Sequence, residues 1–222
     1  MAGRFLLSPR PYNRREFMQH ICNTEENIEA LKQQLEAEPV FAYDIEYLSE
    51  KKQFLGLGIA IKNHSFYIPF QHDTNMPQIA PSLFFNYLKD TFESKTILKA
   101  GHGMMGLELG LLEKYGVFVE NYFDTLIAHW LVDENTKQGL KDLMLIEYGE
   151  VRTKFKSLPK NYPLKITAEY CMLDAENTLQ LYNTLLPRLQ EEKENTCFKD
   201  IEMTVIKIFL EINKNGIRED MP

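Results

Sequence analysis

The sequence predicts an α/β domain in which helices flank a mixed β-sheet. Three extended runs rich in aromatic and aliphatic residues come first, over residues 40–47, 54–61 and 65–70. From residue 80 onward, apolar residues recur at the spacing of helices, with a short buried strand expected at 96–100. Strands first, helices later and at least one crossover connection together favour a mixed sheet covered by helices.

Each element has its own local signal. A helix is expected over residues 23–38, with Asn23 as its cap and a stripe of Ile28, Leu31 and Leu35 on one face. Short polar turns join the three strands into a meander. The later helices are expected at residues 82–91, 106–115, 123–132, 140–148, 167–190 and 200–213, the fifth of them capped by Thr167.

Composition limits the class of protein. The chain has 222 residues and a mass of 26.0 kDa, enough for one domain or one domain with a short appendage. Its net charge of −7 gives no overall basic surface, so any contact with nucleic acid has to be local or mediated by metal ions. Three widely spaced cysteines and the lack of a bilayer-length apolar run predict a soluble cytoplasmic protein with no membrane partner.

An acidic pair interrupts the first strand. Asp44 and Glu46 are two residues apart, so strand alternation places both side chains on the same face. Their neighbours are apolar, and two close carboxylates in such a setting repel one another unless a cation neutralises them. A divalent metal is one solution, because hard cations prefer carboxylate oxygens. The other interpretation is two acids in an exposed loop.

A second polar pair stands on the long helix near the C-terminus. Tyr170 and Asp174 are four residues apart and therefore share one helix face. The tyrosine hydroxyl can donate a hydrogen bond or orient a water molecule. Taken alone, this spacing is also common on surface helices. Asp124 is expected to be an acid at a helix N-terminus.

Taken in order, these segments resemble the 3′-5′ exonuclease domain of family A DNA polymerases, the DEDD-type nucleases with a catalytic tyrosine. The resemblance covers residues 38–222. It is carried by residues 41–46 and 170–174, with support from 66–70, 123–126 and 139–143.

The resemblance implies a ribonuclease H-like fold and a division of the chain into three parts. Residues 1–38 would form an N-terminal lead-in and helix, and residues 39–195 the exonuclease domain. Residues 196–222 would be the start of a helix like that of the polymerase thumb. The natural polypeptide would then also contain a polymerase domain.

The resemblance also implies roles for individual residues. Asp44, Glu46 and Asp174, with a fourth carboxylate, would bind two Mg²⁺ or Mn²⁺ ions at the scissile phosphate, and Tyr170 would position the attacking water. The side chains that follow the acidic pair would stack on terminal bases or wedge between them, although ordinary packing explains them equally well. These side chains are Tyr47 and Leu48.

The second motif departs from the family pattern, which has an aspartate near the start of a helix. Residues 99–112 contain no aspartate. Counting back from Tyr115, the acid nearest the expected place is Glu108, whereas counting forward from Gly101 leads to Leu107. One residue is therefore inserted, and Glu108 is the candidate fourth ligand. His102 is expected to be a packing or phosphate-side residue, because Mg²⁺ prefers oxygen.

Three functions are consistent with these features. The first is a metal-dependent proofreading exonuclease that removes nucleotides from single-stranded or frayed DNA 3′ ends. The second is a degenerate exonuclease fold that only binds single-stranded DNA or braces a polymerase, an idea that rests on the altered second motif. The third is a free-standing exoribonuclease like RNase D, which the thumb-like tail disfavours.

Overall fold

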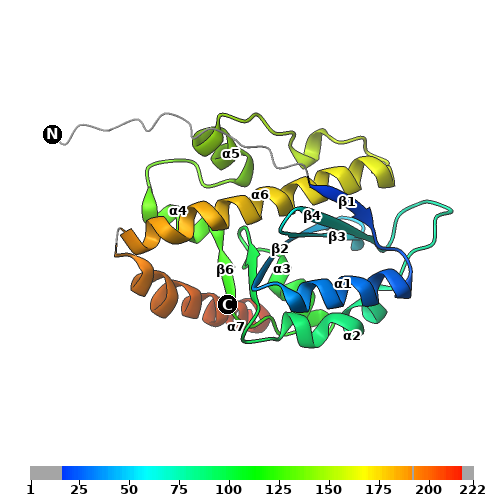
Figure 1. Cartoon of the computed structure of the whole chain (residues 1–222), viewed down its shortest axis with the longest axis horizontal. Coiled ribbons are helices and arrows are strands. Elements are labelled where there is room, and N and C mark those ends of the chain that lie inside the picture. Colours follow the sequence, from blue (N-terminus) through cyan, green and yellow to red (C-terminus); the bar gives the residue numbers. More distant parts are fainter. Residues whose placement is uncertain (1–16, 192, 217–222) are drawn as a thin grey trace, which may run out of the picture.

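The computed structural model describes residues 17–191 and 193–216, whose strands form one six-stranded sheet (Figure 1). Its order is β1-β4-β3-β2-β5-β6. The pairs β2–β3 and β3–β4 are antiparallel, and the remaining pairs are parallel, so the predicted mixed sheet is confirmed. The strands are β1 (Met18–Ile21), β2 (Val40–Leu48), β3 (Gln53–Ile61), β4 (His64–Pro69), β5 (Leu98–Gly101) and β6 (Tyr122–Asp124).

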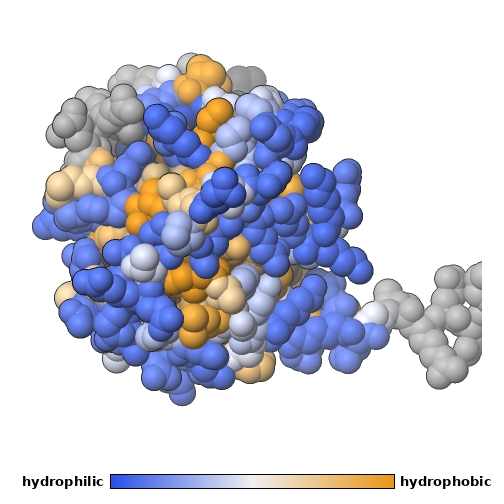
Figure 2. All heavy atoms as spheres, turned by 90° about the vertical axis from the view of Figure 1, so that its right-hand side faces the viewer, coloured by the Kyte–Doolittle hydropathy of each residue, from blue (hydrophilic) through white to orange (hydrophobic). Residues whose placement is uncertain are grey.

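Helices cover both faces of the sheet. In Figure 1, α6 crosses one face, where it contacts β2, β3, β4 and β5, and α1 and α2 lie on the opposite side. The face drawn in Figure 2 is mostly hydrophilic, with apolar side chains gathered near its centre. The α-helices are α1 (Glu25–Ala37), α2 (Pro81–Phe92), α3 (Glu108–Lys114), α4 (Thr125–Val132), α5 (Leu140–Tyr148), α6 (Leu164–Glu191) and α7 (Met203–Asn215).

The predicted apolar faces form the core. Ile28, Leu31 and Leu35 of α1 are fully buried, as expected from their spacing. The leucines of α3 also face inward, which fixes the rotation of this short helix. None of the helices in the described part of the chain has the length and continuous apolar surface needed to cross a bilayer.

Several local expectations were wrong. Strand β1 lies in a stretch that was expected to be a polar lead-in. The sequence gives no strand signal there because an exposed edge strand requires no apolar alternation. The cap of α1 is Thr24, whose side chain accepts from the backbone N–H of Asn27, rather than Asn23. Phe123 belongs to the short strand β6 and not to the helix that follows it.

The long helix α6 also begins earlier than expected. It starts at Leu164, so Thr167 lies inside the helix, where its N–H donates to the carbonyl of Pro163. The N–H groups at the start of a helix have no partner within the helix, and proline lacks a backbone N–H. Pro163 is therefore well placed just before the first residue of α6. The first 16 residues of the expected lead-in and residues 217–222 of the thumb-like segment lie outside the described residues.

Glycine on β3 allows α6 to approach the sheet closely. Gly58 pairs with Asp44 of β2 in the antiparallel register. A Cβ atom on Gly58 would lie only 2.6 Å from the carbonyl oxygen of Cys171 on α6. No larger residue fits without moving the helix backbone. The helix is therefore held directly over the acidic pair of β2.

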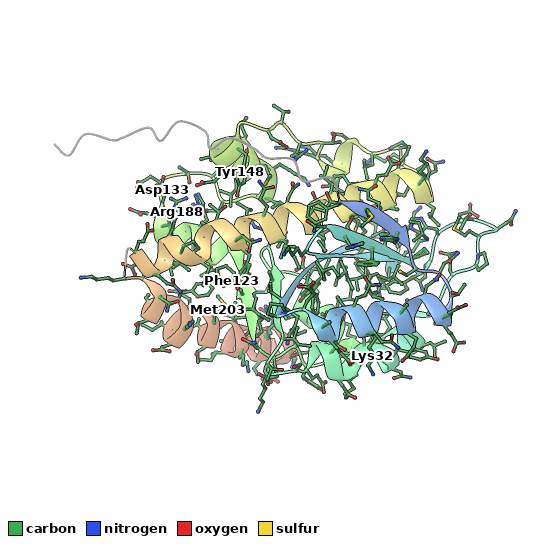
Figure 3. The ribbon with its side chains drawn as sticks, in the orientation of Figure 1. Lys32, Phe123, Asp133, Tyr148, Arg188 and Met203 are labelled. Atoms are coloured by element: carbon green, nitrogen blue, oxygen red, sulfur yellow. The ribbon has the colours of Figure 1, made fainter. Side chains whose placement is uncertain are left out.

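Helix α5 is fixed against α6 by polar contacts. Arg188 of α6 donates to Glu147 over 2.6 Å, and Tyr148 hydrogen-bonds Thr184 over 2.6 Å. Figure 3 labels Tyr148 and Arg188 on these two helices. This pairing determines where the N-terminal end of α5, including Lys141, lies relative to α6.

The substitution Gly58→Ala tests the close approach. Because the added methyl meets backbone and not a flexible side chain, we expect a loss of roughly 1–3 kcal/mol in the free energy of unfolding. Urea denaturation measures this loss. The matched control is Gly110→Ala in α3, where a Cβ meets nothing within 4 Å and alanine should stabilise the helix by about 1 kcal/mol. Equal stability of Gly58→Ala and wild type would contradict the proposed constraint.

Candidate active site

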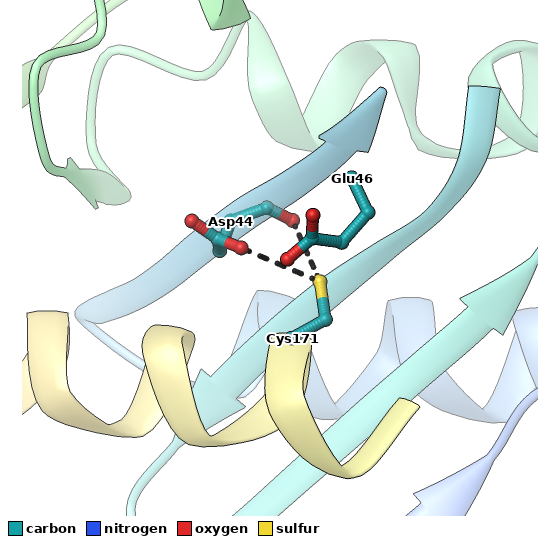
Figure 4. A group of neighbouring side chains, drawn as sticks. All are labelled: Asp44, Glu46 and Cys171. Atoms are coloured by element: carbon teal, nitrogen blue, oxygen red, sulfur yellow. Dashed lines mark hydrogen bonds between the residues drawn. The ribbon is translucent and has the colours of Figure 1, made fainter. Parts of the chain in front are cut away.

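The acidic pair of β2 faces α6, and both carboxylates are on the same face of the strand, as the spacing predicted (Figure 4). Asp44 is partly buried and Glu46 is buried. Cys171 of α6 lies next to them, and one potential ligand atom from each of the three residues lies within 4.8 Å of the others. The Cys171 thiol donates to the backbone carbonyl and to Oδ2 of Asp44, over 3.4 and 3.5 Å.

Burial makes charge unfavourable on both carboxyl groups. It raises the pKa of Asp44 to about 6, an effect that Lys141 and the Cys171 thiol partly oppose. The pKa of Glu46 is raised well above its ordinary value, first by burial and then by the neighbouring Asp44. A cation between the two groups would offset both effects. This donor set therefore fits a divalent cation.

A lysine connects the two predicted site residues of α6. Asp174 is buried, and its carboxylate forms an ion pair with the ammonium of Lys141 from α5. The same ammonium lies 4.4 Å from the centre of the Tyr170 ring. Burial lowers the pKa of Lys141 to about 8, although Asp44 and Glu46 raise it. The structure thus brings Tyr170 and Asp174 together on one helix face, beside the acidic pair.

The phenol of Tyr170 stays protonated at neutral pH. Its pKa is raised, first by burial and then by the nearby Glu46 and Asp44. A protonated phenol can donate a hydrogen bond, and the hydroxyl oxygen can accept one. Tyr170 is therefore suited to orienting a polar molecule beside the carboxylates.

Glu108 is the first residue of α3 and lies within electrostatic reach of the acidic pair. Burial raises its pKa to about 8, and Asp44 is the next largest cause. Glu108 in turn raises the pKa of Glu46. In the turn before α3, Gly103 has φ +72° and its carbonyl accepts from the N–H of Gly106. The role of Glu108 as a metal ligand stays a prediction.

Asp124 organises this turn. It caps α4, as expected for an acid at a helix N-terminus, by accepting from the N–H of Leu126 over 2.9 Å. The same carboxylate accepts from the N–H groups of Gly103 and Met104, over 2.9 and 2.8 Å. Asp124 therefore positions the segment that leads into Glu108.

His102, Tyr47 and Leu48 are the residues that were predicted to contact nucleic acid. The ring of His102 contacts the hydroxyl of Thr125 over 2.9 Å, and burial lowers its pKa to about 4. Tyr47 packs edge-on against Phe54, and with Leu48 it lines a pocket at the end of β2. Contact of His102, Tyr47 and Leu48 with nucleic acid stays a prediction.

Sequence reasoning assigned no role to two residues at this site. Cys171 lies inside the Tyr170–Asp174 motif but was given no contact with Asp44. Lys141 lies in the supporting segment 139–143, where its basic side chain was the available signal. Only the packing of α5 against α6 shows that Lys141 reaches Asp174.

Comparison with known proteins identifies the family. The model of the 3′-5′ exonuclease family matches residues 19–190. The chain belongs to this family. DNA polymerase I of Borreliella burgdorferi is 28% identical over 177 residues, and DNA polymerase I of Treponema pallidum is 27% identical over 117 residues. These alignments cover 76% and 48% of this chain but only 19% and 12% of the polymerases, so the chain spans a small part of their length.

Solved structures of exonucleases share the fold. RNase D of Escherichia coli superposes with a TM-score of 0.72 at 16% identity, covering 87% of this chain and 50% of that one. The catalytic core of RRP6 from Trypanosoma brucei gives a TM-score of 0.64 at 18% identity, with 93% and 54% covered. The expected ribonuclease H-like architecture is thereby confirmed.

The raised carboxyl pKa values predict how stability depends on pH. A carboxyl pKa that is higher in the folded than in the unfolded chain contributes stability at acid pH, and that contribution is lost as pH rises through about 6. In EDTA, Asp44→Asn should therefore melt at a higher temperature than wild type at pH 8, with the difference shrinking toward pH 4. Circular dichroism melts measure this.

The control is Asp73→Asn, which changes the same charge in an exposed loop and should shift the melting temperature much less at pH 8. A wild type that matches or exceeds the stability of Asp44→Asn at pH 8 would show that the acidic pair is not under electrostatic strain.

Proposed function

We propose that this chain is a metal-dependent 3′-5′ exodeoxyribonuclease that acts as the proofreading module of a longer family A polymerase. The observation that carries the proposal is the acidic pair Asp44 and Glu46 packed against α6, the helix that carries Tyr170 and Asp174. Lys141 contacts both of these α6 residues. The family supplies the 3′-5′ direction. The polymerase relatives favour DNA as substrate, whereas the RNase D structures, at 16% identity, bear on the fold alone.

Each residue has a separate task in this proposal. Mg²⁺ or Mn²⁺ ions held by Asp44, Glu46 and Asp174 would supply positive charge to stabilise the attacking and leaving oxygens. Tyr170 orients the attacking water through its protonated hydroxyl. Lys141 must release Asp174 when a cation binds there. Its ammonium then remains near enough to attract the phosphate of a substrate to this acidic protein.

The polymerase context has support on α7. Ile208, Phe209 and Ile212 of this helix are exposed, and an adjoining domain would cover such an apolar face. We propose that the exonuclease domain ends at residue 195 and that residues 196–222 are the start of the thumb. Strand β1 belongs to the same sheet, so the domain also includes residues before the predicted start at 39. The alignment with much longer DNA polymerases agrees with a polymerase domain in the same polypeptide.

A second candidate is a degenerate fold that binds single-stranded DNA without cutting it. The ion pair between Lys141 and Asp174 favours this candidate, because the carboxylate that would bind a metal ion is already paired with an ammonium group. The lack of an aspartate in residues 99–112 favours it as well. The two candidates differ only in whether phosphodiester bonds are broken.

The decisive assay uses 5′-end-labelled single-stranded DNA, and RNA of the same sequence, with Mg²⁺ or Mn²⁺ or with EDTA. We expect stepwise shortening of DNA from its 3′ end, strongest with Mn²⁺ and stopped by EDTA. Asp174→Asn should abolish it because a metal ligand is lost, whereas Tyr170→Phe should reduce the rate by ~10²-fold or less. Cleavage of RNA alone, or binding without cleavage, would favour the alternatives.

The role of Glu108 is tested separately. If it is the fourth ligand, wild type should bind one Mn²⁺ tightly and a second loosely, and Glu108→Gln should lose the loose one. Electron paramagnetic resonance titration of free Mn²⁺ counts both. Glu29→Gln, an exposed position on α1, is the matched control. Identical titrations of Glu108→Gln and wild type would remove Glu108 from the ligand set.

A further inference from the structure

Two histidines from neighbouring strands meet at the edge of the sheet. His20 lies on the edge strand β1, and His64 is the first residue of β4, which runs beside it (Figure 1). In the parallel register Met18 pairs with His64 and His20 pairs with Phe66, so strand alternation places both histidine side chains on one face. Nε2 of His20 lies 3.1 Å from Nδ1 of His64.

This histidine pair, His20 and His64, is separate from the acidic cluster. Phe66 pairs with Ile59 of β3, and Ile59 pairs with Tyr43 of β2, the residue before Asp44. Alternation therefore puts the histidine pair on the sheet face opposite to the carboxylate of Asp44. The proposed exonuclease makes no use of either imidazole.

The distance between the two nitrogens fits a shared metal ion. Zinc binds imidazole nitrogen at about 2.0–2.1 Å, so two nitrogens in adjacent coordination positions lie about 2.9–3.4 Å apart for angles of about 90–109° at the metal. The distance of 3.1 Å between Nε2 of His20 and Nδ1 of His64 falls inside this range. A cation could therefore bind both rings with small rotations of the side chains.

A buried phenylalanine holds the rings in place. The ring of His20 stacks on that of Phe66 at 5.0 Å, with 20° between the planes, and on that of His64 at 5.4 Å, with 23° between the planes. Phe66 is buried, His20 is exposed and His64 is half-buried. The nitrogens are thus fixed on regular strands and still open to solvent, which leaves water to fill the other positions around an ion.

The chemistry of the donors selects the kind of metal. Without a cation, one imidazole donates an N–H to the other. Burial and the neighbouring His64 lower the pKa of His20, which favours the neutral ring with a lone pair available. When both nitrogens bind a metal, the donor ring carries its proton on its other nitrogen, so no net proton is released. Imidazole nitrogens suit Zn²⁺, Cu²⁺ and Ni²⁺, whereas carboxylates suit Mg²⁺ and Mn²⁺.

We propose that His20 and His64 together bind a transition-metal cation of the Zn²⁺ type, and that this ion fastens β1 to β4. Strand β1 has four residues and stands at the end of the sheet order, next to β4. A link across this pair opposes local opening of the edge strand. The proposal does not depend on the exonuclease function.

Nuclear magnetic resonance tests the identity of the ligand atoms. Zn²⁺ is titrated into ¹⁵N-labelled protein, and long-range ¹H–¹⁵N correlations report each imidazole nitrogen. We expect Zn²⁺, but not Mg²⁺, to shift Nε2 of His20 and Nδ1 of His64, and to slow amide exchange in β1. A titration in which Zn²⁺ leaves both nitrogens unshifted would overturn the proposal.

Binding by variants is measured by isothermal titration calorimetry with Zn²⁺. All proteins carry Asp44→Asn and Glu46→Gln, so that the carboxylate site does not contribute. Loss of even an indirect partner of a metal ligand costs ~10- to 100-fold in affinity, so His20→Asn and His64→Gln should each weaken binding at least ~10-fold. Met18→Leu, an exposed position on the same strand, is the matched control and should bind as its parent does.

Circular dichroism melts establish that each variant is folded. If folded His20→Asn or His64→Gln binds Zn²⁺ as tightly as Met18→Leu does, the histidine pair is not a metal site. Because these measurements use no DNA and no cleavage, their outcome is independent of the nuclease assay.

Discussion

The site depends on the close contact between helix α6 and strand β3. Gly58 lets the backbone of Cys171 come within a distance that any side chain would block. Since Gly58 pairs with Asp44, this contact places Tyr170, Cys171 and Asp174 over the acidic pair. The neighbouring polar contacts between α5 and α6 then bring Lys141 to the same place. The close approach at Gly58 thus brings together groups from β2, α5 and α6.

Electrostatics gives this assembly its chemistry. Burial raises the pKa values of Asp44, Glu46 and Glu108, and the nearby Asp44 raises those of Glu46 and Glu108 further. Lys141 relieves part of the repulsion from one side, and a divalent cation would relieve more of it. Because the carboxyl groups must be deprotonated to hold a cation, cation binding should strengthen as pH rises through their raised pKa values. Stability of the metal-free fold changes in the opposite direction.

The sequence predicted most of the elements because their signals are local. The alternation of β2 placed Asp44 and Glu46 on one face, and helical spacing joined Tyr170 to Asp174. The contact of Lys141 with Asp174 could not be predicted, since it depends on how two helices pack. Strand β1 was missed because an exposed edge strand needs no apolar pattern, and its pairing with β4 is a tertiary effect.

The central claim is that the carboxylates under α6 form a cation site. Crystals soaked in Mn²⁺ would test it directly, because anomalous scattering locates the ion without reference to activity. We expect a peak between Asp44, Glu46 and Asp174, with the Lys141 ammonium moved off Asp174. A map in which Mn²⁺ binds elsewhere, or is absent from this cluster while Lys141 still contacts Asp174, would contradict it.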